Sequence, residues 1–269
     1  MPSYTDTHCH LNYTWFDEDL DDILQRACEA RVGRILIPGF DLDACKRAVQ
    51  LSETYETLYA AVGIHPNDSM TWNDQTRKEL DYLARHPKVL AIGEIGLDYY
   101  RDRAPMELQQ TILREQLELA AIHGKPVIIH NRQAENDLYP LLFDWQEELQ
   151  KNGVALADKP GILHAFAENS EAAREMIEHN FYIGVGGVVT FPKALQVQET
   201  VRSLSLQSIL LETDSPFLTP QAHRGQRNEP AYIPLIAEKI ASLLNLPEEE
   251  VAAITTRNAE NLFHWGLPE

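Results

Sequence analysis

An alternation of short apolar runs with longer amphipathic stretches is the feature that most constrains the fold of this 269-residue chain. The short runs are rich in β-branched residues, which favours strands, and the longer stretches have the spacing of amphipathic helices. The expected strands are residues 4–8, 34–38, 58–63, 89–93, 126–130, 161–164, 181–184 and 208–212. The expected helices between them include residues 17–30, 42–54, 73–85, 105–123, 136–151 and 170–179.

Strands that alternate with helices are typical of βα units around a parallel sheet. Eight such strands in a chain of this length predict a (β/α)8 barrel, a fold that is often built as one undivided domain. We therefore expect a single domain that takes in residues 1–269.

The charge balance restricts the partners of the chain. Its 23 Lys and Arg residues against 41 Asp and Glu residues give a formal net charge of −18. This argues against a basic groove that holds long nucleic acid, but it leaves short strands, chain ends and small molecules open. No apolar run reaches the roughly 18 residues of a membrane span, and the first residues lack the pattern of a signal peptide. The cytoplasm is the expected compartment, with no membrane partner, and the oligomeric state stays open.

Potential metal ligands follow the ends of the predicted strands, where barrels of this kind carry their active sites. His8 and His10 come at the end of the first strand, about 7 Å apart along the chain and on the same face. Cys9 between them faces the other way. Such a pair of imidazoles can chelate one ion, although two unrelated loop histidines would give the same pattern.

Glu94, His130, His164 and Asp214 follow later apolar runs in the same way. A carboxylate in the apolar, glycine-flanked surroundings of Glu94 would be costly to bury unless a charge compensates it, and a metal ion supplies that charge. An ion pair with a barrel arginine or lysine is the alternative for Glu94, and a hydrogen-bonded core histidine is the alternative for His130. The recurrence of such residues at successive strand ends favours a shared metal centre.

Six segments of the sequence, taken in order, resemble the TatD family of metal-dependent deoxyribonucleases in the amidohydrolase superfamily. They are DTHCHL at 6–11, GIHP at 63–66, GEIGLDY at 93–99, KPVIIH at 125–130, ETDSP at 212–216 and RGQRNEP at 224–230. The resemblance covers nearly the whole chain, so residues 1–269 are expected to form a TatD-like metal-dependent hydrolase barrel.

The resemblance implies a phosphodiester hydrolase that uses two divalent metal ions and acts as an exonuclease on single-stranded ends. The implied ligands are His8, His10 and Asp214 for one ion, His130 and His164 for the other, and Glu94 as the bridge. Asp214 would also orient or deprotonate the attacking water. Mg, Mn and Zn are all candidate ions. The implied substrate is short or single-stranded nucleic acid, or another small phosphodiester.

Further polar residues near the strand ends are candidates for contacting the substrate or orienting the ligands. They are His65, Asp98, Arg132, Arg224, Arg227 and Asn228. An ion pair with Glu135 is the alternative for Arg132.

One segment departs from the family pattern. Family members often have Cys-Phe-Ser-Gly after the fourth histidine, whereas this chain has Ala-Phe-Ala-Glu at 165–168. The carboxylate of Glu168 would repel a phosphate backbone and so leaves the substrate preference open. The alternative function is an amidase, lactonase, deaminase or other small-molecule hydrolase on the same barrel, since fold alone does not dictate the bond cleaved. Glu94 stands where many such relatives have a carboxylated lysine, which favours the nuclease. A metal-dependent binding protein without catalysis is the alternative from another class.

Overall fold

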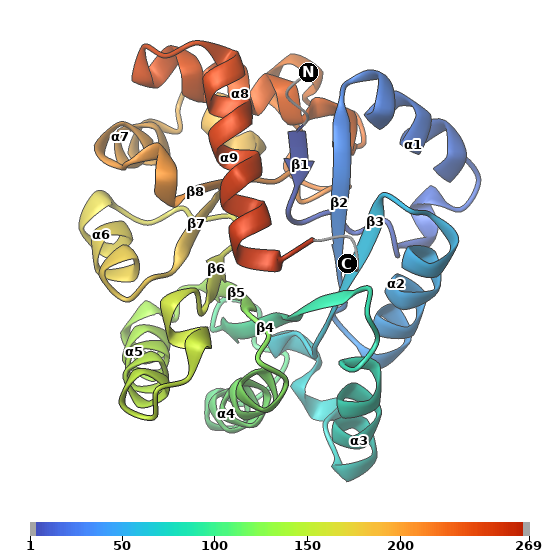
Figure 1. The fold of residues 1–269 in the computed structure, drawn as a ribbon, viewed down its shortest axis with the longest axis vertical. Coiled ribbons are helices and arrows are strands. Elements are labelled where there is room, and N and C mark those ends of the chain that lie inside the picture. Colours follow the sequence, from blue (N-terminus) through green and yellow to red (C-terminus); the bar gives the residue numbers. More distant parts are fainter. Residues whose placement is uncertain (1–3, 266–269) are drawn as a thin grey trace. The chain divides into compact units, whose positions relative to one another are not determined.

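The computed structural model describes residues 4–265. Its eight strands form one sheet in which each strand is hydrogen-bonded to the next along the chain. The strands are β1 (Tyr4–Asp6), β2 (Val32–Pro38), β3 (Leu58–Val62), β4 (Val89–Asp98), β5 (Val127–Arg132), β6 (Gly161–Leu163), β7 (Tyr182–Val185) and β8 (Ile209–Leu211). Helices occupy the segments between the strands (Figure 1). The predicted (β/α)8 barrel is confirmed.

The first six α-helices begin and end close to the predicted positions, and the last three were not predicted. They are α1 (Leu20–Glu29), α2 (Leu42–Thr54), α3 (Asp74–Leu83), α4 (Met106–His123), α5 (Glu135–Lys151), α6 (Ser170–Glu178), α7 (Leu195–Ser203), α8 (Ile233–Leu244) and α9 (Glu248–Phe263). Asp41 caps α2 by accepting a 2.7 Å hydrogen bond from the backbone of Ala44. Gly124 ends α4 in the left-handed conformation that favours glycine. Among residues 4–265, no helix has both the length and the hydropathy that crossing a bilayer requires.

The described chain divides into two compact units. Unit 1 contains residues 4–37, 165–177 and 182–265, and unit 2 contains residues 38–164 and 178–181. In unit 1, β1 pairs with β2 and β7 pairs with β8, all in parallel. The ends of β8 and β1 are also joined, because the backbone amide of Thr7 donates a 3.0 Å hydrogen bond to the carbonyl oxygen of Leu211. This contact brings the first and last strand ends of the chain together.

In unit 2, β3, β4, β5 and β6 pair in parallel. Strand β4 continues to Asp98, beyond the predicted end at residue 93, because Gly96 and Asp98 are in register with His130 and Arg132 of β5. Gly96 permits this pairing. Its φ of +147° is unfavourable for other residues, and an added Cβ would lie 2.0 Å from the carbonyl oxygen of His130.

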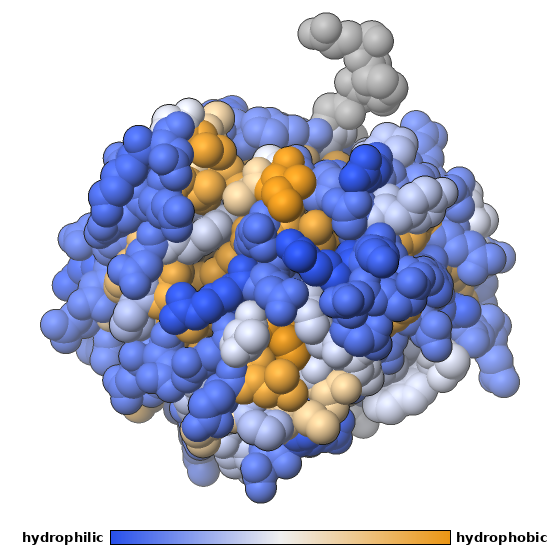
Figure 2. All heavy atoms as spheres, turned by 90° about the horizontal axis from the view of Figure 1, so that it is seen from below, coloured by the Kyte–Doolittle hydropathy of each residue, from blue (hydrophilic) through white to orange (hydrophobic). Residues whose placement is uncertain are grey.

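The strands form the apolar core, and the charged side chains lie mainly at the surface. In unit 2, Ile92, Ile95 and Ile129 are fully buried, and in unit 1 Ile35 and Leu211 are almost fully buried. On the face drawn in Figure 2, hydrophilic side chains predominate between smaller apolar patches. Buried polar residues therefore call for an explanation, and several of them, such as His8, His164 and Asp214, lie shortly after strands.

Candidate metal centre

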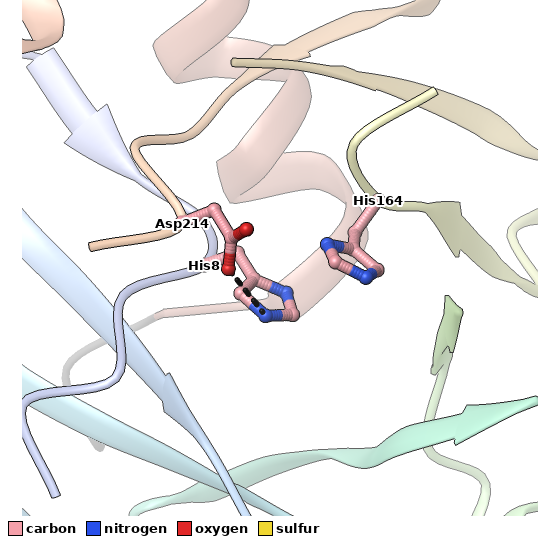
Figure 3. Close-up of side chains that lie close together, drawn as sticks. All are labelled: His8, His164 and Asp214. Atoms are coloured by element: carbon pink, nitrogen blue, oxygen red, sulfur yellow. Dashed lines mark ion pairs between the residues drawn. The ribbon is translucent and has the colours of Figure 1, made fainter. Parts of the chain in front are cut away.

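Unit 1 contains a group made of His8, His10 and Asp214. The Nε2 atoms of His8 and His10 lie 3.1 Å apart. Oδ1 of Asp214 lies 3.8 Å from Nε2 of His8 and 3.6 Å from Nε2 of His10 (Figure 3 draws the first of these ion pairs). All three residues are buried. One carboxylate oxygen and two ring nitrogens therefore converge, as the sequence predicted for these three residues.

Backbone contacts between the segments after β1 and β8 hold this group. The amide of Asp214 donates to the carbonyl oxygen of His8 over 2.8 Å, and the amide of His10 donates to that of Ser215 over 2.8 Å. Cys9 and Ser215 form a parallel bridge, so Cys9 is used in pairing and packing. Asp214 has a φ of +55°, a left-handed conformation that aspartate adopts more readily than most residues and that is frequent at functional sites.

Asp6 forms hydrogen bonds with the segments that carry His8 and Asp214, a role that was not predicted from the sequence. Its carboxylate accepts hydrogen bonds from the amide of Thr213 at 2.9 Å, the hydroxyl of Thr213 at 2.6 Å and the amide of His8 at 3.3 Å. Complete burial raises the pKa of Asp6 to about 7, although the hydrogen bonds from Thr213 oppose the rise. The available signal was the position of Asp6 two residues before His8, at the start of the first motif.

Unit 2 contains a second group around Glu94. Oε1 of Glu94 lies 2.8 Å from Nδ1 of His130 and 2.9 Å from Nε2 of His164. The same two nitrogens are 3.2 Å apart. His164 follows the short strand β6 (Figure 3), while Glu94 and His130 lie inside β4 and β5. The structure thus brings these three predicted ligands together.

Asp98 contacts the other side of the His130 ring. Its Oδ2 lies 3.5 Å from Nε2 of His130, and its Oδ1 accepts hydrogen bonds from the amides of Tyr100 and Arg101, each over 3.0 Å. Burial tends to raise the pKa of Asp98, but the interaction with His130 and these hydrogen bonds outweigh it and lower the pKa to about 2. Asp98 is therefore an ionised carboxylate placed to orient the ring of His130, a candidate ligand.

His65 lies closer to the ligands than the sequence analysis assumed. Its Nε2 is 3.5 Å from Oε1 of Glu94, and its Nδ1 accepts a 3.1 Å hydrogen bond from the amide of Asn67. Burial and the neighbouring His130 ring lower the pKa of His65 to about 3, which keeps the imidazole neutral. Ligand atoms of His65, Glu94 and His130 all lie within 4.8 Å of one another. His65 can therefore assist either as a ligand or as a neutral hydrogen-bonding group.

Both groups have the chemistry and spacing that a divalent ion needs. Ligand atoms bound to one ion at about 2.0–2.2 Å lie roughly 3–3.5 Å from each other. The nitrogen pairs, at 3.1 Å and 3.2 Å, fall in this range, and the carboxylate distances of 2.8–3.8 Å bracket it. Imidazole and carboxylate together suit Zn, Mn and related ions. The residues present therefore fit metal binding in both units.

Two predicted substrate residues carry exposed guanidinium groups stacked on aromatic rings. The guanidinium carbon of Arg132 lies 4.1 Å from the ring centroid of Tyr100, and that of Arg224 lies 4.5 Å from the ring centroid of Phe191. Stacking leaves the edge of a guanidinium group available for a phosphate. The carboxylate of Glu168 accepts a 3.1 Å hydrogen bond from the amide of Ala167 in its own loop.

Arg227 and Asn228, the other two predicted substrate residues after β8, have structural contacts. Arg227 donates a 2.5 Å hydrogen bond to Asp19 and another to the carbonyl oxygen of Trp15. Asn228 is fully buried, and its amide nitrogen donates to the carbonyl oxygens of Thr213 at 2.8 Å and Phe217 at 2.6 Å. Both residues fasten the segment after β8, which is the structural alternative to a contact with substrate.

A (β/α)8 barrel whose strand ends carry buried histidine and carboxylate groups has the architecture of a metal-dependent hydrolase. Comparison with known proteins agrees: the family described as TatD related DNase matches residues 5–264, and the chain belongs to this family. The uncharacterized metal-dependent hydrolase YabD of Bacillus subtilis is 42% identical over 258 residues, which cover 96% of this chain and 98% of the relative. YjjV of Escherichia coli K12, described in the same words, is 34% identical over 263 residues, with 97% and 98% covered.

Solved structures give the same result for the fold. The crystal structure of YjjV from Escherichia coli K12, a TatD homologue, superimposes with a TM-score of 0.89 at 33% identity and covers 98% of both chains. A TatD family hydrolase from Entamoeba histolytica superimposes with a TM-score of 0.84 at 24% identity, covering 98% of this chain and 99% of the other. The family and the barrel predicted from the sequence are confirmed, and the chain is a metal-dependent hydrolase.

Proposed function

We propose that this hydrolase cleaves phosphodiester bonds of nucleic acid from single-stranded ends with two divalent ions, drawn from Mg, Mn and Zn. The observation that carries the metal dependence is the position of the buried Glu94 carboxylate, 2.8 Å and 2.9 Å from the ring nitrogens of His130 and His164. The family description, a DNase, supports nucleic acid as the substrate.

In the proposed ligand assignment, each of the two groups holds its own ion. His8, His10 and Asp214 of unit 1 hold one ion, and His130 and His164 of unit 2 hold the other. Glu94 as a ligand shared by both ions is part of the proposal. It is supported by the resemblance to the family.

The chain's own residues would then act as follows. Bound divalent ions supply charge that acidifies water and stabilises the developing negative charge of the reaction. Asp214, whose Oδ1 faces both His8 and His10, orients the attacking water and accepts its proton. Arg132, stacked on Tyr100, presents its guanidinium group to a substrate phosphate.

The net charge of −18 favours short contacts with a strand end over long contacts with a duplex. The test is the turnover of linear single-stranded oligonucleotides and of closed circular duplex, each with Mg, Mn or Zn added to chelator-treated protein. We expect faster cleavage of the linear single strands. Faster cleavage of the closed circle would contradict the preference for ends.

A lactone, an amide and a chromogenic phosphodiester, assayed beside the oligonucleotides, separate the proposal from a different hydrolase on the same barrel. Turnover of the lactone or amide, with no turnover of any phosphodiester, would refute the nuclease assignment.

A further inference from the structure

Three aromatic side chains of unit 1 pack against one another beside the His8, His10 and Asp214 group. The ring centroid of Tyr13 lies 5.8 Å from that of Trp15 and 5.7 Å from that of Phe217. Trp15 and Phe217 are 5.9 Å apart. Each ring therefore contacts the other two, and we call these three residues the aromatic platform.

Backbone hydrogen bonds tie two members of the aromatic platform to predicted metal ligands. The amide of Tyr13 donates to the carbonyl oxygen of His10 at 3.1 Å, and the amide of Phe217 donates to that of Asp214 at 2.8 Å. The imidazole of His10 also contacts both rings, with centroid distances of 5.5 Å to Tyr13 and 6.4 Å to Phe217. The position of the aromatic platform is thus fixed relative to the ligands.

Two rings of the aromatic platform are exposed, although the segment that carries Trp15 is anchored. Trp15 is 58% exposed and Phe217 is 40% exposed, whereas the neighbouring Phe16 is fully buried. The guanidinium carbon of Arg227 lies 4.6 Å from the ring centroid of Phe16, and the same group donates to the backbone of Trp15 and to Asp19. The indole ring of Trp15 is therefore exposed even though the segment that carries it is held in place.

Core packing does not explain such a cluster. Single exposed aromatic residues are ordinary, and Tyr82 on α3, 76% exposed, is one example. Three exposed or partly exposed rings in mutual contact form a patch of the kind that binds ligands. Aromatic rings stack on unpaired nucleobases of any sequence, and this attraction does not depend on positive charge. A chain with a net charge of −18 has no excess of basic residues to follow a long phosphate backbone, so stacking adds affinity that does not depend on positive charge.

We propose that the aromatic platform stacks an unpaired nucleobase of the strand whose phosphodiester bond is cleaved. This inference rests on the proposed function and names its specificity-determining residues Tyr13, Trp15 and Phe217. A base inside a duplex cannot offer its face to these rings, so the aromatic platform also supplies a physical reason for the preference for single strands. One stacked base strengthens binding about 5- to 150-fold.

The test compares a short single-stranded oligodeoxynucleotide with a strand of equal length in which tetrahydrofuran abasic sites replace the terminal nucleosides. In Trp15→Ala, kcat/KM for the base-containing strand should fall about 5- to 150-fold, mainly through KM. The abasic strand should be cleaved as fast as by the wild type. Trp15→Phe should keep most of the activity, and Tyr82→Ala, the matched exposed aromatic, should leave both rates unchanged. Equal losses on both strands, or no loss on either, would overturn the inference.

A binding measurement separates failure of this inference from failure of the proposed function. If the wild type cleaves neither strand, the nuclease assignment fails. The same protein is then titrated with both strands while its tryptophan fluorescence is recorded. Quenching by the base-containing strand alone, with the quenching lost in Trp15→Phe, would support the aromatic platform. Equal quenching by both strands, or none, would refute it.

Discussion

Oδ2 of Asp98 lies 3.5 Å from Nε2 of His130, on the opposite side of the imidazole from the nitrogen that faces Glu94 at 2.8 Å. The pKa of about 2 keeps Asp98 ionised at neutral pH, so its negative charge favours a proton on Nε2 of His130. A proton held on Nε2 leaves the lone pair of Nδ1 for a metal ion. The pair therefore sets which nitrogen of His130 can act as a ligand.

Replacing Asp98 should weaken metal binding without abolishing it. Asp98→Asn removes the charge that favours a proton on Nε2 of His130, and we expect the metal affinity to fall about 10- to 100-fold. Competition with a fluorescent chelator measures this affinity. Asp144→Asn, an exposed carboxylate on α5, is the control and should bind metal as the wild type does. Equal affinities for Asp98→Asn and the wild type would show that Asp98 does not orient His130.

Glu94→Gln should lose metal and activity together. The substitution keeps the shape of the side chain but removes the charge that lies between His130 and His164. In the proposed centre both ions share that charge, so metal content should fall for both. Mass spectrometry of the metal content beside turnover of a phosphodiester checks this, with folding matched by circular dichroism. Full metal content in the Gln variant would argue against Glu94 as a shared ligand.

Asp214→Asn should separate metal content from activity. His130 and His164 are unchanged in this variant and should retain metal, whereas turnover should fall by roughly 10²- to 10⁴-fold, as expected for the loss of a general base. The measurements are those used for Glu94→Gln. Near-normal turnover with metal bound would exclude Asp214 as the base and make His65 the first candidate, because its neutral imidazole lies 3.5 Å from Glu94.

Gly96→Ala should disrupt the pairing of β4 with β5. The new Cβ would lie 2.0 Å from the carbonyl oxygen of His130 at a φ of +147°, so the strands would have to separate. We expect the free energy of unfolding in urea to fall by about 3 kcal/mol or more. Gly153→Ala is the matched control, because its φ is +66° but no atom lies within 4 Å, and it should cost about 1 kcal/mol. Equal losses in the two variants would show that the close approach of the strands is unimportant.

The sequence predicted the order of the strands and which histidines and carboxylates lie close together, because both depend on local pattern. Apolar runs end at His8, His130 and His164, and the structure places His8 and His164 just after β1 and β6 and His130 inside β5. The prediction stopped β4 at residue 93 because Glu94 and the glycines around it interrupt the apolar run. Pairing with β5, which Gly96 permits, extends the strand to Asp98.

Roles that depend on distant contacts could not be read from local pattern. Asp6 binds Thr213, which lies 207 residues away, and no spacing rule connects the two. Asn228 has the sequence context of a polar surface loop, but the fold buries it against the backbone of Thr213 and Phe217. The aromatic platform joins the segments after β1 and β8 and was missed for the same reason.

The stoichiometry of divalent metal in chain purified without chelator, measured together with single-strand cleavage, tests the central claim most directly. We predict two ions per chain, loss of cleavage when a chelator removes them, and recovery when Mn, Mg or Zn is returned. Cleavage that persists in the metal-free protein, or protein that binds no divalent ion at saturating concentration, would contradict the account.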